Sequence, residues 1–390
     1  MSTLCPATAL RRQAAGSLTM RATQRRNRFR RAVTVDRQPG CETLLQKGRG
    51  TLQAHLKDLL RLPYRRWHTA APGRASWTKV AVMNLIPMTR SRTIELAARA
   101  RRLPHWALAI GLTLALVLVG QLGALPVIVI LRALYPGGSE SVADQPLPGS
   151  VAMAALLVST FGLMLVLLWA WLRWFERRPF WTLGFERAGA LRKYARGFAI
   201  GLLAFGASVA ILGTSGLTSL DHVEGAAVGG ILIVLVGWIV QGASEEILTR
   251  GWLLNVIAAR YRPWLGVLTS VIVFSLLHGL NPNIGPLPLL NLVLFALFAG
   301  LYMLWEDGLW GIAAFHSAWN WAQGNLFGMQ VSGNEAGATL LQMKVAAGAD
   351  LMTGGGFGPE GGLAVTIVML AALGLVGFAL ARKHAARSQA

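Results

Sequence analysis

Two adjacent glutamates are the first candidates for chemistry, because they lie inside an apolar stretch of the chain. Glu245 and Glu246 belong to the sequence Gln241-Gly-Ala-Ser-Glu-Glu-Ile-Leu-Thr-Arg250, whereas the other 15 of the 17 acidic residues fall outside the long apolar runs. A charged side chain near the centre of a bilayer costs about 2.5–3.5 kcal/mol on insertion scales. Both glutamates are therefore candidates for a functional site.

Helical geometry gives the two glutamates different roles. Adjacent residues of a helix point about 100° apart, so the two side chains face different surroundings. Glu246 precedes Arg250 by four residues, which is the favourable order for an ion pair on one helix face. We therefore predict a structural ion pair between Glu246 and Arg250 that braces the site. Glu245 lies on the neighbouring face and needs a partner from another helix.

Two of the seven histidines, His278 and His316, lie within later apolar runs and are the candidate partners. The other five lie in the N-terminal stretch, at the end of a run or between runs, where we expect solvated side chains. The helix of Glu245 should turn at Pro263, 18 residues after Glu245 and 15 residues before His278. At 1.5 Å per residue, the two side chains lie about 27 and 22 Å from this turn. The sequence predicts that Glu245 and His278 face each other.

His316 and Asn320 add a pair of hydrogen-bond donors. They are four residues apart, so they share one helix face and can project into one cavity. Taken singly, a buried glutamate, histidine or asparagine serves equally well to link helices inside a membrane. Together these residues supply a base, a second titratable ring and a donor pair, which are the components needed to hydrolyse a carbonyl compound.

The helices that must carry these residues are predicted from the apolar runs. Of the 390 residues, 54% are hydrophobic and only 14% are charged, whereas soluble domains have about 25% charged residues. A helix that crosses a bilayer needs about 20 predominantly apolar residues. We predict an all-α, polytopic membrane helical bundle of about eight transmembrane helices, at residues 106–131, 150–172, 197–217, 228–248, 264–280, 287–305, 309–328 and 363–381.

The basic residues predict the orientation of this bundle. After residue 104, 13 Lys and Arg fall on one side of an eight-span topology, and only Arg132 and Lys344 fall on the other. An excess of Lys and Arg marks the cytoplasmic side of a membrane protein. We expect an integral, multi-pass protein of the bacterial inner-membrane type, with both termini cytoplasmic.

The chain divides into three parts by composition. Residues 1–104 form a basic N-terminal extension that we expect to be disordered, with 22 of the 37 Lys and Arg, four acids and both cysteines, Cys5 and Cys41. It is interpreted as an arm on anionic lipid, as an organelle transit peptide, or as sequence upstream of a true start at Met83 or Met88. Residues 105–381 form the transmembrane domain, with a motif core at 228–328, and residues 382–390 form a basic cytoplasmic tail. Because the positive charge is concentrated in the extension, we expect membrane lipid and no nucleic acid as a partner.

Three motifs resemble those of the CPBP family of intramembrane proteases, which includes the type II CAAX prenyl endopeptidases and relatives linked to bacteriocin processing and self-immunity. The family's Glu-Glu-x-x-x-Arg matches Glu245-Glu246-Ile-Leu-Thr-Arg250, its Phe-x-x-x-His matches Phe274-Ser-Leu-Leu-His278, and its His-x-x-x-Asn matches His316-Ser-Ala-Trp-Asn320. The motifs occur in order, each in its own apolar run. The resemblance covers about residues 173–328.

The resemblance implies an endopeptidase and gives each motif residue a role. Glu245 and His278 activate water, His316 and Asn320 stabilise the oxyanion, and Glu246 with Arg250 braces the site. The substrate is a membrane-associated or prenylated (CAAX-like) peptide, bound in a cavity that opens toward the cytoplasmic half of the membrane. The family is also labelled metallopeptidase, and Glu245, His278 and His316 are the residues that would hold Zn²⁺ with water in the fourth position.

Two other functions stay open at the level of sequence. The first is a non-catalytic membrane scaffold or immunity protein that retains the protease fold, although a degenerate motif would have favoured it more than the intact one does. The second is a transporter, since carboxylates inside a membrane also relay protons.

Overall fold

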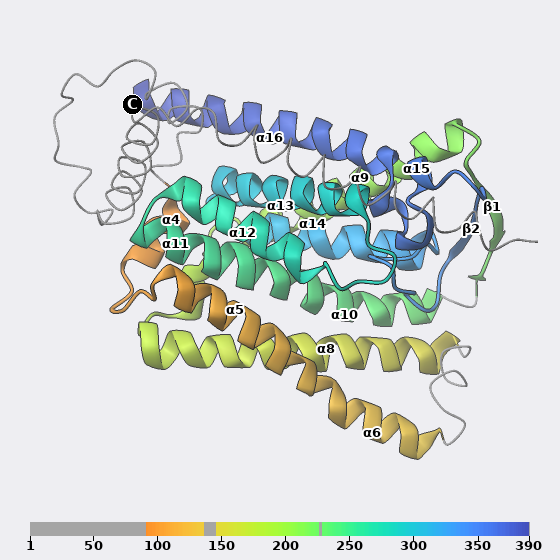
Figure 1. Ribbon diagram of the computed structural model, residues 1–390, viewed down its shortest axis with the longest axis horizontal. Coiled ribbons are helices and arrows are strands. Elements are labelled where there is room, and N and C mark those ends of the chain that lie inside the picture. The colour runs from red at the N-terminus through yellow and green to blue at the C-terminus, as the bar shows by residue number, and fades with distance from the viewer. Residues whose placement is uncertain (1–90, 136–145, 226–227, 390) are drawn as a thin grey trace, which may run out of the picture. The chain divides into compact units, whose positions relative to one another are not determined.

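A computed structural model describes residues 91–135, 146–225 and 228–389, and almost all of them are helical (Figure 1). Apolar segments with few charges form helices in a membrane because each backbone N–H and C=O is then paired within its own segment. The first half of the chain contains α4 (Arg92–Ala98), α5 (Trp106–Gly120), η2 (Gln121–Gly123), α6 (Ala124–Leu134), α8 (Pro146–Trp171), η3 (Leu172–Glu176), η4 (Phe180–Leu183), α9 (Ala190–Thr214) and β1 (Thr218–Val223).

The second half carries the motifs on consecutive helices. A single helical segment holds α10 (Val228–Glu246), η6 (Ile247–Leu254) and α11 (Asn255–Arg260). The remaining elements are α12 (Pro263–Leu277), α13 (Pro286–Glu306), α14 (Trp310–Trp321), η7 (Ala322–Leu326), β2 (Leu341–Val345), α15 (Asp350–Thr353), η8 (Gly355–Phe357), η9 (Pro359–Gly361) and α16 (Leu363–Gln389).

The predicted all-α, polytopic bundle is confirmed. All eight predicted spans are helical, but they differ in length from the prediction. Within the described residues, six helices are long and apolar enough to cross a membrane: Trp106–Leu134, Pro148–Glu176, Ala190–Thr214, Val228–Arg260, Pro286–Glu306 and Leu363–Arg387. The predicted fifth span is the shorter apolar helix Pro263–Leu277, and the predicted seventh span is α14 with η7.

The motif helices pack closely at the middle of this bundle. Helix α10 contacts both α8 and α14, α14 also packs on α9, and α13 lies between α12 and α16. Glycines allow the close approach: a Cβ atom added to Gly242 would lie 2.8 Å from both the backbone N and the Oγ of Ser317 on α14. Small residues at such crossings let two backbones approach within a membrane.

The helix that carries Glu245 and Glu246 changes its winding immediately after them. Residues Ile247–Leu254 form a π-helix, and Ala322–Leu326 form another after Asn320. A wider turn frees backbone carbonyls from their usual partners. The Asn255 side chain satisfies two of them, since its Nδ2 donates to the carbonyl oxygens of Arg250 at 2.9 Å and of Gly251 at 3.0 Å. The regular α-helical spacing assumed from the sequence therefore does not hold within Ile247–Leu254.

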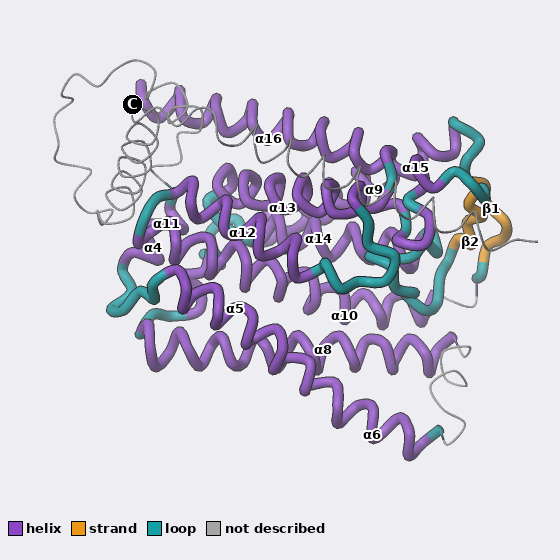
Figure 2. Tube along the Cα trace, viewed as in Figure 1, coloured by secondary structure: helices purple, strands orange, loops and turns teal. Residues whose placement is uncertain are grey.

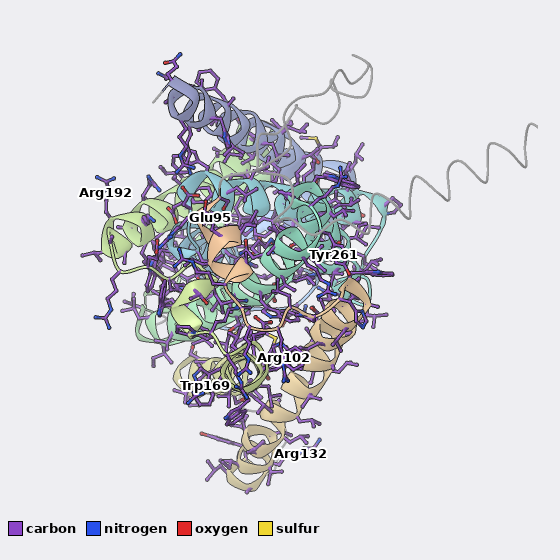
Figure 3. All side chains as sticks on the ribbon, turned by 90° about the vertical axis from the view of Figure 1, so that its left-hand side faces the viewer. Glu95, Arg102, Arg132, Trp169, Arg192 and Tyr261 are labelled. Atoms are coloured by element: carbon purple, nitrogen blue, oxygen red, sulfur yellow. The ribbon has the colours of Figure 1, made fainter. Side chains whose placement is uncertain are left out.

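The two ends of the helical bundle differ in chemistry, and we call them the basic end and the strand end. The basic end (left in Figure 1) holds the starts of α5, α9 and α12 and the ends of α8 and α16, with Arg102, Arg173, Arg177, Arg192 and Arg260. Figure 3 looks onto this end and labels Arg102 and Arg192 there. The strand end (right in Figures 1 and 2) holds β1, β2, residues 278–285 after α12, and residues 329–362.

The Gly-rich stretch 329–362 at the strand end is held in place by hydrogen bonds. Strand β2 within it pairs antiparallel with β1, and the Nζ of Lys344 lies 2.6 Å from the Asp221 carboxylate. Glu360 accepts hydrogen bonds from the Ser332 Oγ at 2.7 Å and from the Trp319 Nε1 at 3.1 Å. The two short strands were missed in the sequence, because neither has a clear alternation of polar and apolar residues.

The terminal segments extend the bundle beyond the predicted transmembrane domain. Helix α4, which the sequence analysis counted with the basic extension, buries Ile94 and Leu96, and the guanidinium of Arg92 lies 3.0 Å from the Glu186 carboxylate. Residues 1–90 of that extension lie outside the described residues. At the other terminus, the predicted basic tail continues α16, and the Nζ of Lys383 lies 2.6 Å from an oxygen of Asp307.

We predict that a chain beginning at Met88 keeps the thermal stability of the full chain, whereas a chain beginning at His105 loses much of it. The shorter chain lacks α4, and burial of each large aliphatic side chain such as Ile94 or Leu96 contributes about 1.5–3 kcal/mol. Thermal unfolding in detergent measures the difference, with Ile94→Ala in the full chain as the matched control. Equal melting temperatures for all four proteins would contradict a structural role for α4.

Candidate active site

A cavity of about 350 Å³ is lined by five of the seven motif residues, among them Phe274. Its lining includes Glu245 from α10, His278 from the end of α12, and His316 with Asn320 from α14. The other two motif residues, Glu246 and Arg250, are fully buried beside it. The structure thus brings together side chains that are separated by as many as 75 positions in the sequence, from Glu245 to Asn320.

Glu245 presents one free carboxylate oxygen to both histidines. Its Oε1 accepts a hydrogen bond from the Nε2 of Gln241 at 2.6 Å. Its Oε2 is buried and has no hydrogen-bond partner among the described residues. This oxygen lies 3.9 Å from the Nε2 of His278 and 3.8 Å from the Nε2 of His316. A buried acceptor without a partner is energetically costly, so the gap between these three atoms suits a small polar ligand such as water.

Hydrogen bonds fix which face of each imidazole ring points into this gap. The Nδ1 of His278 lies 2.9 Å from the carbonyl oxygen of Phe274, and a carbonyl oxygen only accepts, so Nδ1 carries the hydrogen. By the same reasoning, the Nδ1 of His316 donates to the Oε1 of Glu246 at 2.9 Å. In neutral rings the lone pair is then on Nε2. The Nε2 of each ring therefore faces the free oxygen of Glu245, as an acceptor in the neutral ring and as a donor in the imidazolium form.

Glu246 has two partners on different helices. Its Oε1 lies 3.0 Å from the Nη1 of Arg250, and both side chains have no exposed surface. The guanidinium carbon of Arg250 also lies 4.2 Å from the centroid of the Phe274 ring, a favourable cation–π contact. The structure contains the ion pair that the sequence predicted, and it adds the contact with His316, which no local spacing could reveal.

Gln241 is a site residue that the sequence analysis missed. Its Oε1 accepts from the Nδ2 of Asn320 at 3.0 Å, and its Nε2 donates to Glu245. It therefore connects the third motif to the first. The available signal was its position: Gln241 is four residues before Glu245 in an apolar run, on the same helix face.

The cavity extends from Glu245 toward the strand end of the bundle. Its other polar lining residues include Asn281, Ser332, Asn334 and Glu360, which belong to residues 278–285 and 329–362, and Asn291 near the start of α13. Its apolar wall includes Val117, Met153, Leu157, Phe161 and Met164 from α5 and α8. The lining therefore reaches the strand end of the bundle, while the expected opening toward the cytoplasmic half of the membrane stays a prediction. The lining reaches this end because α12 ends at Leu277, which places His278 next to the loops of the strand end.

The three residues proposed as zinc ligands are of suitable types but are not spaced as a zinc site. Within residues 91–135, 146–225 and 228–389, no group of three or more His, Cys, Asp or Glu is arranged to hold a metal ion. Tetrahedral zinc with bonds of about 2.0–2.2 Å keeps neighbouring ligand atoms about 3.3–3.6 Å apart. The separations from Glu245 Oε2 to the two Nε2 atoms are 3.8 and 3.9 Å. This spacing suits a hydrogen-bonded water better than a zinc ion.

The fold and the site together define a polytopic helical membrane protein with a buried glutamate–histidine cluster. Residues 227–322 match the family described as type II CAAX prenyl endopeptidase Rce1-like, and this segment contains all three motifs. The resemblance predicted from the motifs is confirmed over this segment, which is similar to the CPBP family of intramembrane proteases. No curated protein and no solved structure matches the chain.

We predict that Glu246→Gln destabilises the protein by about 3–5 kcal/mol, because it leaves the buried charge of Arg250 without its counter-ion. Adding Arg250→Met should recover part of the lost stability. Cleavage activity should stay low in the double variant, since the carboxylate that holds the His316 ring is still missing. Thermal unfolding and cleavage of the single and double variants test this, and a double variant that melts no higher than the single one would exclude the ion pair.

Proposed function

We propose that the protein is an intramembrane endopeptidase that hydrolyses a peptide bond with water activated by Glu245 and His278. One observation carries this proposal: the Oε2 of Glu245 is buried without a partner among the described residues and faces the Nε2 of His278 at 3.9 Å. A water molecule with hydrogen bonds of about 2.8 Å bridges two atoms at this separation. The family match supports a CAAX-type protease in general.

Glu245 is the proposed general base. Its Oε2 takes one proton from the bridging water. The Nε2 of His278 accepts a hydrogen bond from the other hydrogen of that water and so orients it. The water oxygen attacks the peptide carbonyl and forms a tetrahedral intermediate. The protonated Glu245 then gives its proton to the leaving amine as the C–N bond breaks. The products are a carboxylic acid and an amine, and Glu245 returns to its starting state.

Asn320 and His316 are the proposed donors to the oxyanion. The Nδ2 of Asn320 donates one hydrogen to Gln241 and has a second one to donate. The Nε2 of His316 carries a hydrogen only in the imidazolium form, because Nδ1 already donates to Glu246. The Glu246 carboxylate lies 2.9 Å from the ring, and an imidazolium in this position donates from both of its nitrogens. Donors aimed at developing negative charge are among the largest contributions to catalysis.

The substrate is proposed to be a membrane-associated or prenylated peptide. The apolar wall of the cavity, from Val117 on α5 to Met164 on α8, favours an apolar chain or apolar side chains next to the scissile bond. Both termini are proposed to be cytoplasmic, because the start of α5 and the end of α16 lie at the basic end.

We predict that Glu245→Gln abolishes cleavage while the protein still inserts and folds, because the amide keeps the shape of the side chain but cannot accept the proton. The matched control is Glu224→Gln, which changes an exposed carboxylate outside the cavity lining. Mass spectrometry of membrane peptides from host cells with each variant gives the readout. Wild-type turnover by Glu245→Gln would favour the non-catalytic scaffold instead.

We predict that Gln241→Met lowers kcat roughly 10- to 100-fold, the effect of losing a hydrogen bond to a charged group worth about 1.5–3 kcal/mol. KM should change little, because Gln241 positions Glu245 and does not bind the peptide. Steady-state cleavage by the purified variant measures both constants. A change in KM alone would show that Gln241 contributes to substrate binding instead.

We predict that prolonged treatment with phenanthroline leaves most of the activity in place, since water is activated directly by side chains. Elemental analysis of the same sample should give less than one zinc per chain. Stoichiometric zinc, with activity that disappears on chelation and returns when zinc is added, would overturn this mechanism and make His316 a ligand.

A further inference from the structure

The cavity and the basic residues lie at opposite ends of the helices. Among the described residues outside α10 and η6, the Lys and Arg lie at the basic end, apart from Arg132 and Lys344. The lining residues of the cavity include none from the basic-end connections 172–189, 261–262 and 307–309 within the described chain. This separation determines from which side a molecule reaches Glu245.

The helical positions of the lining residues give the direction of the cavity. Asn291 is five residues after the start of α13, and Val365 is two residues after the start of α16. Met153 is seven residues after the start of α8. These three helix starts, together with the end of α12 at Leu277, all lie at the strand end (Figure 1). The cavity thus leads from mid-bundle to the strand end.

The mouth of the cavity is polar and is framed by two loops that contact each other. The Nδ2 of Asn281 donates to the carbonyl oxygen of Ser332 at 3.1 Å. Asn334 and Glu335 also line the cavity and are exposed. Water and a polar peptide backbone therefore meet hydrogen-bonding groups at the strand end, while the wall formed by α5 and α8 remains apolar.

We propose that the substrate enters this cavity from the non-cytoplasmic side of the membrane, so that the substrate class is a peptide segment displayed on that face. An excess of Lys and Arg marks the cytoplasmic side, which assigns the strand end to the opposite side. The proposal rests on the proposed function, because a bound peptide is a substrate only if the protein cleaves it. The route into the cavity is a property of the fold and does not depend on cleavage. A cytoplasmic C-terminus carrying a prenyl group is not the substrate under this proposal.

Thiol labelling tests the route without any need for catalysis. In a Cys5→Ser, Cys41→Ser background, single cysteines replace Leu277 and Leu157 in the cavity wall and Asn334 at the mouth. The control is Arg192→Cys at the basic end, where the side chain is exposed. The probe is a permanently charged methanethiosulfonate reagent, which does not cross membranes, added to right-side-out or inside-out vesicles.

The three cavity cysteines should react at least tenfold faster in right-side-out vesicles, and the Arg192→Cys control should show the reverse preference. Two cavity-wall positions are used so that a misfolded variant at one of them does not decide the result. Faster labelling of the cavity from inside-out vesicles, or equal labelling from both sides, overturns the proposal. The same labelling in a Glu245→Gln background separates this outcome from a failure of the proteolytic function, because that variant changes cleavage and leaves the route intact.

Discussion

The rest of the site depends on the carboxylate of Glu246. One of its oxygens lies 3.0 Å from Arg250 and 2.9 Å from the His316 ring, without exposure to solvent. Removing one partner of such a buried pair leaves an unpaired charge, which costs about 3–5 kcal/mol. Because Arg250 also packs on the Phe274 ring, this carboxylate joins the helices of all three motifs. The site therefore keeps its geometry even though it surrounds a cavity.

The offset of adjacent helical residues then leaves Glu245 facing the cavity. A rotation of about 100° separates it from Glu246, so that it faces the cavity while its neighbour faces the packed interior. Gln241 occupies one of its oxygens and leaves the other to the two histidine rings. One carboxylate thus supports the structure and the next is available to a ligand, and the difference arises from helical geometry alone.

The sequence predicted the helices well, and it placed His278 opposite Glu245 although a π-helix interrupts the regular spacing between Glu245 and Pro263. Apolar runs locate the spans, and the turn at Pro263 brings His278 opposite Glu245. Contacts between distant segments were not predictable, as with the His316 bond to Glu246, whose partners are 70 positions apart. The contribution of residues 329–362 to the cavity lining was also not predictable, because a Gly-rich stretch has no periodicity that indicates how it folds. Gln241 was visible in the sequence but resembled an ordinary polar link between helices.

The short helix α12 connects the chemistry with the shape of the strand end. It has 15 residues, which span only about 22 Å at 1.5 Å per residue, less than the hydrocarbon core of about 30 Å. His278 therefore lies where the helix ends. The residues that follow it must cover the rest of the thickness of the hydrocarbon core. Non-helical backbone is tolerated at that depth only where protein or a water-filled cavity satisfies it. Residues 329–362 meet this condition through Glu360, which bonds Ser332 and Trp319. The same loops that compensate for the short helix thus provide a polar path by which water reaches Glu245.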